Sequence, residues 1–440
     1  MLRITPRYLE MLDPTKDRTR RLFERLGISS KDLDSVDGIS LGIDVKTNTY
    51  SRLLTAYHLL DLTLRLQPLV SDVFVEGLDE ATIRDLGQRF PCEVSAGPPV
   101  TDVVIAVGNP SANADASVDA AGWTGAFGSN AGADDDHNPF GALAFAGLAA
   151  GEVFKLAFLA QYPTRNLAKR FVLAAGPFSF WDYSRTSLSP TLEDVELAAV
   201  LVGVGGVGAA VINAFGELGP RLSGTITLVD PDHLDIYNLN RTLYATVEEA
   251  VRGELKVVAA ARSLASRSAV ETIQVGRPYR DFAMSVGTRS ERRFSLVISG
   301  VDRDDIRWEV QRDLPLVLID GATGSQANCR VERIRFAEAG CLGCSRPPQG
   351  EGPMNPDECD APPDPVAPSI SFVSALAGTL AAAEAVKSSL GTGGLAGYFE
   401  HSFVYPPNPE MTGIPARRSD CPVGCSDPRV IDAFHAKWAN

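Results

Sequence analysis

The sequence predicts an α/β protein built from two related halves. Three observations lead to this prediction. A strand, a glycine-rich loop, a helix and a second strand follow one another from residue 195; similar elements recur in the first half; and the alanine-rich segments 140–155 and 372–387 agree at six positions. A chain of 440 residues is also long enough for two or three domains. We expect domains over residues 1–185 and 186–440.

The second half begins with the clearest unit. The apolar run 195–202 predicts a buried strand, residues 209–218 have helical composition, and residues 224–229 (GTITLV) predict a strand that ends at Asp230. Elements in this order open a Rossmann-like nucleotide-binding domain. A further helix is expected over 255–266, strands over 296–299, 316–319 and 329–336, and an alanine-rich helix over 373–390.

The first half repeats part of this pattern. A helix predicted over 53–66 leads to a strand over 72–75, and a strand over 102–107 resembles 296–301. The first half carries GIDVKTNTYSR where the second has its glycine loop, so we expect a nucleotide site in the second half alone. Two segments predict loops: 109–138 is rich in Ala, Asn, Asp, Ser and Gly, and 347–368 holds eight prolines.

Composition excludes several classes of protein. With 45% hydrophobic and 22% charged residues the chain is an ordinary globular one, not a disordered or fibrous one. A net charge of −14 argues against nucleic-acid binding, because an acidic surface repels phosphate. The N-terminus lacks the apolar run of a signal peptide, and the apolar stretch 142–162 contains Glu152 and Lys155, which favours a buried helix over a membrane span. We therefore expect a soluble, cytoplasmic protein without a membrane partner.

The glycine loop predicts phosphate binding. Gly203, Gly205, Gly206 and Gly208 allow a tight turn, after which backbone N–H groups at a helix N-terminus approach an anion. Asp230, at the end of the second strand, is placed to bind ribose hydroxyls. On these residues alone, a nicotinamide-dependent dehydrogenase is the commonest answer.

The residues after Asp230 favour a triphosphate instead. Arg241 and Lys256 are two cations that offset the charge growing on the β- and γ-phosphates as pyrophosphate leaves. Asp302 directly follows the strand 296–299 and its Gly-Val turn, where it can hold a Mg²⁺ ion that bridges those oxygens. The segment between Asp230 and Arg241 also contains Asp232, Asn238 and Asn240.

GVGGVG, LVDPDHLDIYNLNR, the later lysine and SGVDRDDIR together resemble the adenylation core of the ThiF/MoeB/ubiquitin-activating superfamily over about residues 195–390. The resemblance implies that Asp230 binds ribose, that Asn238, Asn240, Arg241 and Lys256 surround the phosphates, with Asp232 in the same site, and that Asp302 binds magnesium. Two simpler readings stay open: Asp232 as a turn cap, and Arg307 as a surface charge.

Six of the seven cysteines follow residue 325. Two close pairs, Cys341 with Cys344 and Cys421 with Cys425, predict a zinc site with four thiolates. These cysteines extend the resemblance to the superfamily as far as residue 425. The second pair has the spacing CxxxC where CxxC is usual, and the alternative is four buried free thiols. Cys92 and Cys329 are expected to be small core residues.

Cys359 lies in the proline-rich loop between the two cysteine pairs. In the activating enzymes that the chain resembles, the cysteine that forms a thioester with the activated protein lies in a loop at this place, here the crossover loop 345–370. Its thiolate would attack the acyl-adenylate and release AMP. The neighbouring Asp357, Glu358 and Asp360 raise a thiol pKa and so oppose this activation. The alternative is an incidental loop cysteine.

Overall the chain resembles the activating enzymes of bacterial ubiquitin-like conjugation operons linked to anti-phage defence (the Bil type). The resemblance implies ATP, Mg²⁺ and Zn²⁺ as cofactors, a ubiquitin-like protein and a conjugating enzyme as partners, and a pseudo-dimer of two halves; self-association stays open. It also implies an arginine from the first half near ATP. Arg18, Arg20 and Arg21 are candidates that equally fit a solvated helix face, and Tyr183-Ser-Arg185 is a similar motif before the second half.

Three other functions are weighed beside this one. The first is adenylation of a sulfur-carrier protein or peptide without a thioester. The second is a non-catalytic nucleotide-binding scaffold, which Arg241, Lys256 and Asp302 argue against because no structural need explains them together. The third is a dehydrogenase.

Overall fold

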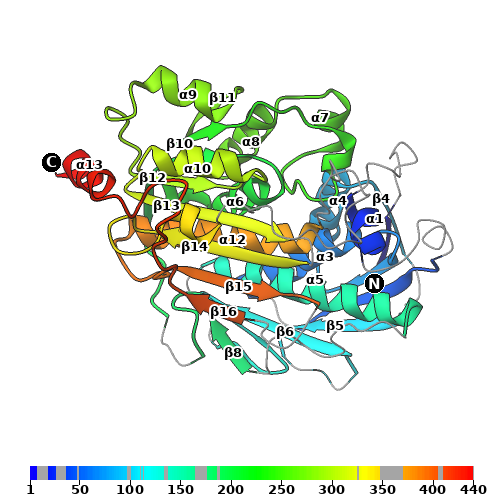
Figure 1. The fold of residues 1–440 in the computed structure, drawn as a ribbon. Helices are drawn as coiled ribbons and strands as arrows, with labels where there is room; N and C mark the ends of the chain where they lie inside the picture. Colours follow the sequence, from blue (N-terminus) through cyan, green and yellow to red (C-terminus); the bar gives the residue numbers. More distant parts are fainter. Residues whose placement is uncertain are drawn as a thin grey trace, which may run out of the picture.

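The computed structural model describes residues 1–6, 18–25, 36–46, 49–96, 101–109, 111, 113–132, 137–163, 176–185, 189–324, 327–346, 370–404 and 410–439. Within them the chain forms two eight-stranded mixed sheets with helices packed against them, which confirms the α/β prediction (Figure 1). The first sheet ends at Ser179 and the second begins at Val195, so the expected boundary at 185/186 lies between them.

The first sheet has the order β4-β1-β3-β2-β5-β6-β7-β8. Its strands are β1 (Leu2–Pro6), β2 (Ile39–Val45), β3 (Val70–Glu76), β4 (Cys92–Ala96), β5 (Val103–Val107), β6 (Ala116–Ala121), β7 (Thr124–Phe127) and β8 (Gly176–Ser179). The helices described in this half are α1 (Arg18–Arg25), α3 (Tyr50–Leu64), α4 (Glu80–Arg89) and α5 (Phe140–Gln161).

The second sheet has the order β11-β10-β9-β12-β13-β14-β15-β16. Its strands are β9 (Val195–Val202), β10 (Leu222–Val229), β11 (Glu271–Val275), β12 (Leu296–Ser299), β13 (Val317–Gly324), β14 (Asn328–Ile334), β15 (Tyr398–Ser402) and β16 (Glu410–Gly413). Its helices are α6 (Gly206–Glu217), α7 (Val247–Val251), α8 (Lys256–Ala265), α9 (Tyr279–Val286), α10 (Asp304–Arg312), α11 (Leu342–Ser345), α12 (Ser371–Ser389) and α13 (Pro428–Trp438), with short 3-10 turns at Gly219–Arg221 and Ile236–Asn238.

Six strands have the same arrangement in both halves. The order β3-β2-β5-β6-β7-β8 corresponds to β10-β9-β12-β13-β14-β15, and every neighbouring pair is parallel or antiparallel alike. The two alanine-rich helices also correspond, since α5 joins β7 to β8 and α12 precedes β15 after β14. They pack against each other at the centre of the molecule, where the rings of Phe154 and Phe372 lie 5.5 Å apart (Figure 1). The internal repeat read from the sequence is thus present in the topology.

The expectation of a loop over 109–138 is wrong in its middle, where β6 and β7 form a hairpin. All six residues of β6 are buried, and a Cβ on Gly125 of β7 would lie 2.1 Å from the ring of Phe145 on α5. The helix packs so closely that these strands need small residues, whose composition imitates that of a loop. Asp119 adds a charge that is typical of loops, but its buried carboxylate pairs with Arg52 at 2.6 Å. The proline-rich segment 347–368 lies outside the described residues.

Helix α5 is long and apolar enough to cross a membrane by length and composition, but 89% of its apolar window is buried inside the protein. Its Glu152 and Lys155 form an ion pair of 2.6 Å that is almost fully buried. The prediction of a buried core helix is therefore confirmed, and the location of the protein in the cell stays a prediction.

Candidate functional site

A cavity of about 460 Å³ lies at the carboxyl ends of the parallel strands β9, β10 and β12. Because β10 and β12 flank β9 on opposite sides, the cavity lies at the point where strand order reverses, where α/β sheets bind ligands. The structure brings eight predicted site residues to its wall: Gly203, Gly205, Gly206, Asp230, Asp232, Arg241, Lys256 and Asp302.

The glycine loop joins β9 to α6. Gly203 has φ +84°, which favours glycine, and α6 begins at Gly206 with Gly205 as its cap, a residue without a side chain to bond to the first N–H groups. The helix N-terminus therefore faces the cavity with backbone donors and the positive end of its dipole. Gly208 does not line the cavity; a Cβ there would lie 2.0 Å from the Gly203 carbonyl oxygen, so it permits close packing of the helix on the loop.

Substitution at two glycines should separate packing from binding. Gly208→Ala is expected to lower the free energy of unfolding by about 1–3 kcal/mol through overpacking. Gly205→Ala is expected to keep stability, because its φ is −77° and no atom lies within 4 Å of the added Cβ, but to weaken nucleotide binding by narrowing the cavity. Urea unfolding and fluorescent-nucleotide titration of both variants measure the difference. Equal destabilisation by the two would contradict this assignment.

Asp230 links the end of β10 to the glycine loop. Its buried carboxylate accepts hydrogen bonds from the backbone N–H of Val204 at 2.6 Å and of Asp232 at 2.8 Å. Burial raises its pKa, against the opposing effect of Lys256 and these two hydrogen bonds. The carboxylate is thus fixed at the cavity wall by the backbone on either side.

Two cations reach the same cavity. Lys256, the first residue of α8, forms an ion pair with Asp232 at 2.7 Å, so Asp232 acts on a side chain rather than as a simple turn cap. Arg241 is buried, and its Nη1 donates to the Tyr237 carbonyl at 3.0 Å and to Asn240 Oδ1 at 2.7 Å. The positive charges of Lys256 and Arg241 favour an anionic ligand at this part of the wall.

Asn238 and Asn240 are absent from the described residues that line the cavity. The Asn238 side chain accepts the Asp235 N–H at 3.0 Å and caps a short 3-10 turn, and Asn240 bonds to Arg241. Both therefore shape the segment that carries Arg241, and contact of either with phosphate stays a prediction.

Asp302 lies exposed at the rim of the cavity, on the turn after β12. The interpretation of Arg307 as a surface charge is wrong. It is buried, lines the cavity, and pairs with Asp320 at 3.0 Å and Asp304 at 2.9 Å. Helix α10 is amphipathic and directs Arg307 inward, toward Asp320 on β13. The sequence pattern of α10 does not show this, because the acidic partner lies on a different element.

Other residues of the wall were not predicted. Tyr279, Arg303, Thr323 and Ser374 also line the cavity. Arg303 adjoins Asp302 in the sequence, which is a usable signal. Ser374 comes from α12, 166 positions after Gly208, and only the packing of α12 on α6 brings it near Gly206.

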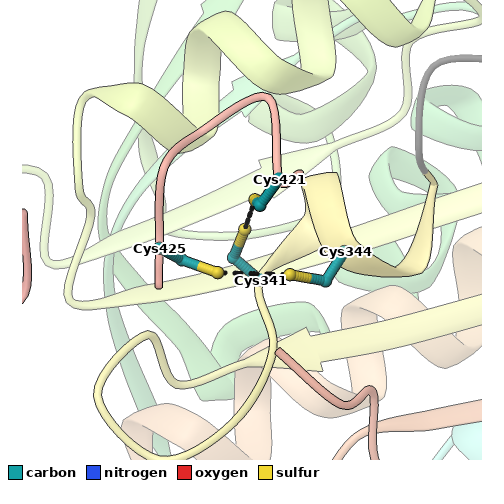
Figure 2. Close-up of side chains that lie close together, drawn as sticks. All are labelled: Cys341, Cys344, Cys421 and Cys425. Carbon is teal, nitrogen blue, oxygen red and sulfur yellow. Dashed lines mark hydrogen bonds between the residues drawn. The ribbon is translucent and has the colours of Figure 1, made fainter. Parts of the chain in front are cut away.

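The four cysteines of the predicted zinc site come together (Figure 2). Cys341 and Cys344 lie at α11, Cys421 and Cys425 in the turn before α13, and all four sulfurs are within 4.8 Å of one another. The Sγ atoms of Cys341 and Cys421 are 3.3 Å apart, and those of Cys344 and Cys425 are 3.2 Å apart. A tetrahedron with Zn–S bonds of about 2.3 Å has edges of about 3.8 Å, so this donor set fits zinc.

The thiols also share protons in a way that favours a metal. Hydrogen bonds from Cys341 and its neighbours lower the pKa of Cys425 to about 5, while the same bonds raise that of Cys341 and burial raises that of Cys344 to about 11. A bound cation would stabilise the thiolate form of the cysteines. The spacing CxxxC is accommodated because Gly424 has φ +77°, which turns the chain between Cys421 and Cys425.

The remaining candidates are cysteines and arginines. Cys359 is outside the described residues. Cys329 is buried on β14 with its pKa raised by burial, and Cys92 is half-buried on β4. Arg18, Arg20 and Arg21 lie on α1, which packs through Phe23 on Phe154. The Tyr183 hydroxyl donates to Glu384 of α12 at 2.8 Å, and the Arg185 guanidinium lies 5.6 Å from the centre of the Phe178 ring.

Comparison with known proteins gives the following. No curated protein sequence matches the chain. Among solved structures, E. coli MccB with MccA-N7isoASN is similar at 16% identity over 53% of this chain and 68% of that chain (TM-score 0.40). Microcin C7 biosynthetic enzyme MccB with N-formylated MccA is similar at 14% over 70% and 97% (TM-score 0.40), and PaaA at 18% over 49% and 64% (TM-score 0.34). Residues 191–423, more than half of the chain, match the ThiF family. This protein therefore belongs to the ThiF family.

Proposed function

We propose that this protein uses ATP to adenylate the C-terminal carboxylate of a ubiquitin-like protein. The observation that carries the proposal is the joint placement of the glycine loop, Asp230, Arg241, Lys256 and Asp302 around one cavity of about 460 Å³. Membership of the ThiF family supports ATP-dependent adenylation of a peptide or protein C-terminus.

In this reaction a carboxylate oxygen of the partner attacks the α-phosphorus of ATP. An O–P bond forms, the bond from the α-phosphorus to the bridging oxygen breaks, and pyrophosphate leaves. The N-terminus of α6 faces the phosphates, Asp230 holds the ribose, and Arg241 and Lys256 offset the charge that develops on the leaving group. Lys256 would exchange its present partner Asp232 for phosphate oxygens.

Asp302 would hold the magnesium ion of the nucleotide. Its carboxylate fits this role because it is exposed at the cavity rim, on the turn that follows β12. A hard dication there would neutralise charge on the phosphate oxygens. Four thiols within 4.8 Å would hold a structural zinc ion that fixes the segment before α13 to α11.

The second step of the proposal is a thioester on Cys359. Its thiolate attacks the acyl carbon of the adenylate, a C–S bond forms, and the C–O bond to AMP breaks; the thiol proton passes to solvent before the attack. The acyl group would then pass to a conjugating enzyme, as in the Bil-type bacterial defence systems that the sequence resembles. Support for this step comes from the sequence position of Cys359 between the two zinc pairs.

The test is a non-reducing gel after incubation with Mg-ATP and a ubiquitin-like protein encoded beside this one. An adduct is expected that requires ATP, disappears with a thiol reductant, and is absent from Cys359→Ala and Asp302→Ala. Cys92→Ala is the matched control and should retain the adduct. AMP release without an adduct would place the protein with enzymes that adenylate a carrier or peptide and form no thioester. If a competent partner gives neither the adduct nor AMP, that result would contradict adenylation itself.

A further inference from the structure

The end of helix α3, in the first half, reaches the segment that carries Arg241 in the second half. Arg65 directly follows α3, and its side chain is fully buried. Its Nε donates to Asp61 Oδ1 at 2.9 Å, and its Nη1 donates to the backbone carbonyl of Leu239. One guanidinium thus joins a carboxylate of its own helix to a carbonyl of the other half.

Leu239 lies two residues before Arg241, in the turn that sets the direction of the Arg241 side chain. Within this turn the Asn238 carbonyl accepts hydrogen bonds from the N–H groups of Arg241 and Thr242, at 3.0 and 2.8 Å. The Leu239 carbonyl is directed instead at Arg65. Leu239 is itself buried, so loss of this donor would leave a buried carbonyl without its charged partner.

The same end of α3 contacts a second segment of the cavity wall. The Ser371 hydroxyl, at the first residue of α12, donates to the Leu62 carbonyl at 3.2 Å. One turn later Ser374 lines the cavity beside Gly206. Residues 61–65 are therefore in contact with the two chain segments whose side chains, Ser374 and Arg241, lie next to Gly206.

We propose that Arg65, held by Asp61, is a positioning residue that fixes Arg241 at the nucleotide cavity from the other half of the chain. This proposal rests on the proposed adenylation, because Arg241 is the group whose placement matters there. An arginine suits the role since its planar fork bonds Asp61 and Leu239 at once, which a lysine would not do with the same geometry. Asp61 balances the buried charge.

The first variant replaces both charges, as Asp61→Leu with Arg65→Met. Removing the pair together leaves no isolated buried ion, so the protein is expected to fold. The kcat of ATP–pyrophosphate exchange should fall about tenfold or more while the KM for ATP changes less than about threefold, because an oriented cation acts mainly on the charge of the transition state. Tyr50→Phe is the matched control: it also removes a hydrogen bond from α3 to a carbonyl of the second half, Glu217 O at 3.2 Å, and should leave kcat unchanged.

A double-mutant cycle identifies the route of the effect. In an Arg241→Ala background the Asp61/Arg65 change should lower kcat by less than about twofold, because the group that it positions is already gone. A full additional tenfold loss in that background would show that Arg65 acts on something other than Arg241 and would overturn the proposal.

Hydrogen exchange separates this proposal from the proposed function. In the Asp61/Arg65 variant, the backbone amides of residues 239–242 should exchange at least about tenfold faster than in the parent protein, whereas those of β10 should keep their rates. We expect this change in amide exchange even if the parent protein does not catalyse ATP–pyrophosphate exchange. That second outcome would contradict the proposed adenylation but not the positioning role of Arg65. Unchanged exchange at 239–242, or an equal change in Tyr50→Phe, would overturn the positioning role.

Discussion

Lys256→Met is expected to lower ATP–pyrophosphate exchange by about 100- to 1,000-fold, the loss seen when one preorganised group that stabilises developing charge is removed. Methionine keeps the apolar stem of the buried lysine and removes only its charge. The released Asp232 carboxylate is mostly solvent-exposed, so stability should change by less than about 1 kcal/mol.

The matched control for this variant is Arg252→Met. Arg252 is another cation of the second half, but it is exposed and paired with Glu248 on α7 at 2.6 Å, away from the cavity wall. Its exchange rate should stay within about twofold of the parent. If both variants lose activity alike, general electrostatics would explain the effect and the assignment of Lys256 would be wrong.

Cys425→Ser is expected to abolish stoichiometric zinc and to lower Tm by about 10 °C or more, because structural zinc sites contribute folding free energy directly. The cluster joins the turn before α13 to α11, and α13 then packs through Phe434 on Phe336, whose ring centres are 5.4 Å apart. Without the metal, this C-terminal segment should detach first and become the earliest site of limited proteolysis.

Metal analysis, a thermal melt and proteolysis measure this result, with Cys92→Ser as the control. Cys92 is half-buried on β4 in the first half, far from the cluster in sequence, and its replacement should leave zinc content unchanged. A Cys425→Ser protein with full zinc content, or with an unaltered melt, would contradict a four-thiolate structural site.

Much of the fold could be predicted because local signals agreed with the final packing. The strands β9 and β12 lie where apolar runs predicted them, and the helices α5 and α12 where their alanine-rich composition did. The hairpin of β6 and β7 could not be read in the same way. Its residues are small because α5 packs closely against them, and this tertiary contact leaves no local pattern in the sequence.

The residues of the candidate site also fall into those that local sequence signals predict and those that depend on tertiary packing. Residues contributed by consecutive turns at strand ends, such as Asp230 and Asp302, follow from strand order alone. Arg307 was misread because its partner Asp320 lies on a separate element, strand β13. Ser374 had no signal because it comes from a helix that meets the glycine loop only in the folded chain. Arg65 was missed since a single arginine at a helix end gives no pattern.

The continuous hydrophobic core bears on how such a chain persists over evolution. One cluster of buried residues runs from Ile4 of β1 to Val404 after β15 and includes α3, α5, α6 and α12. In addition, Lys387 of α12 donates to the carbonyls of Phe180 and Trp181 from the first half, at 2.7 and 3.0 Å. Deleting the half that lacks a glycine loop would therefore expose the apolar faces of the other half to water. Selection on folding alone would therefore retain the first half, whether or not it binds a ligand of its own.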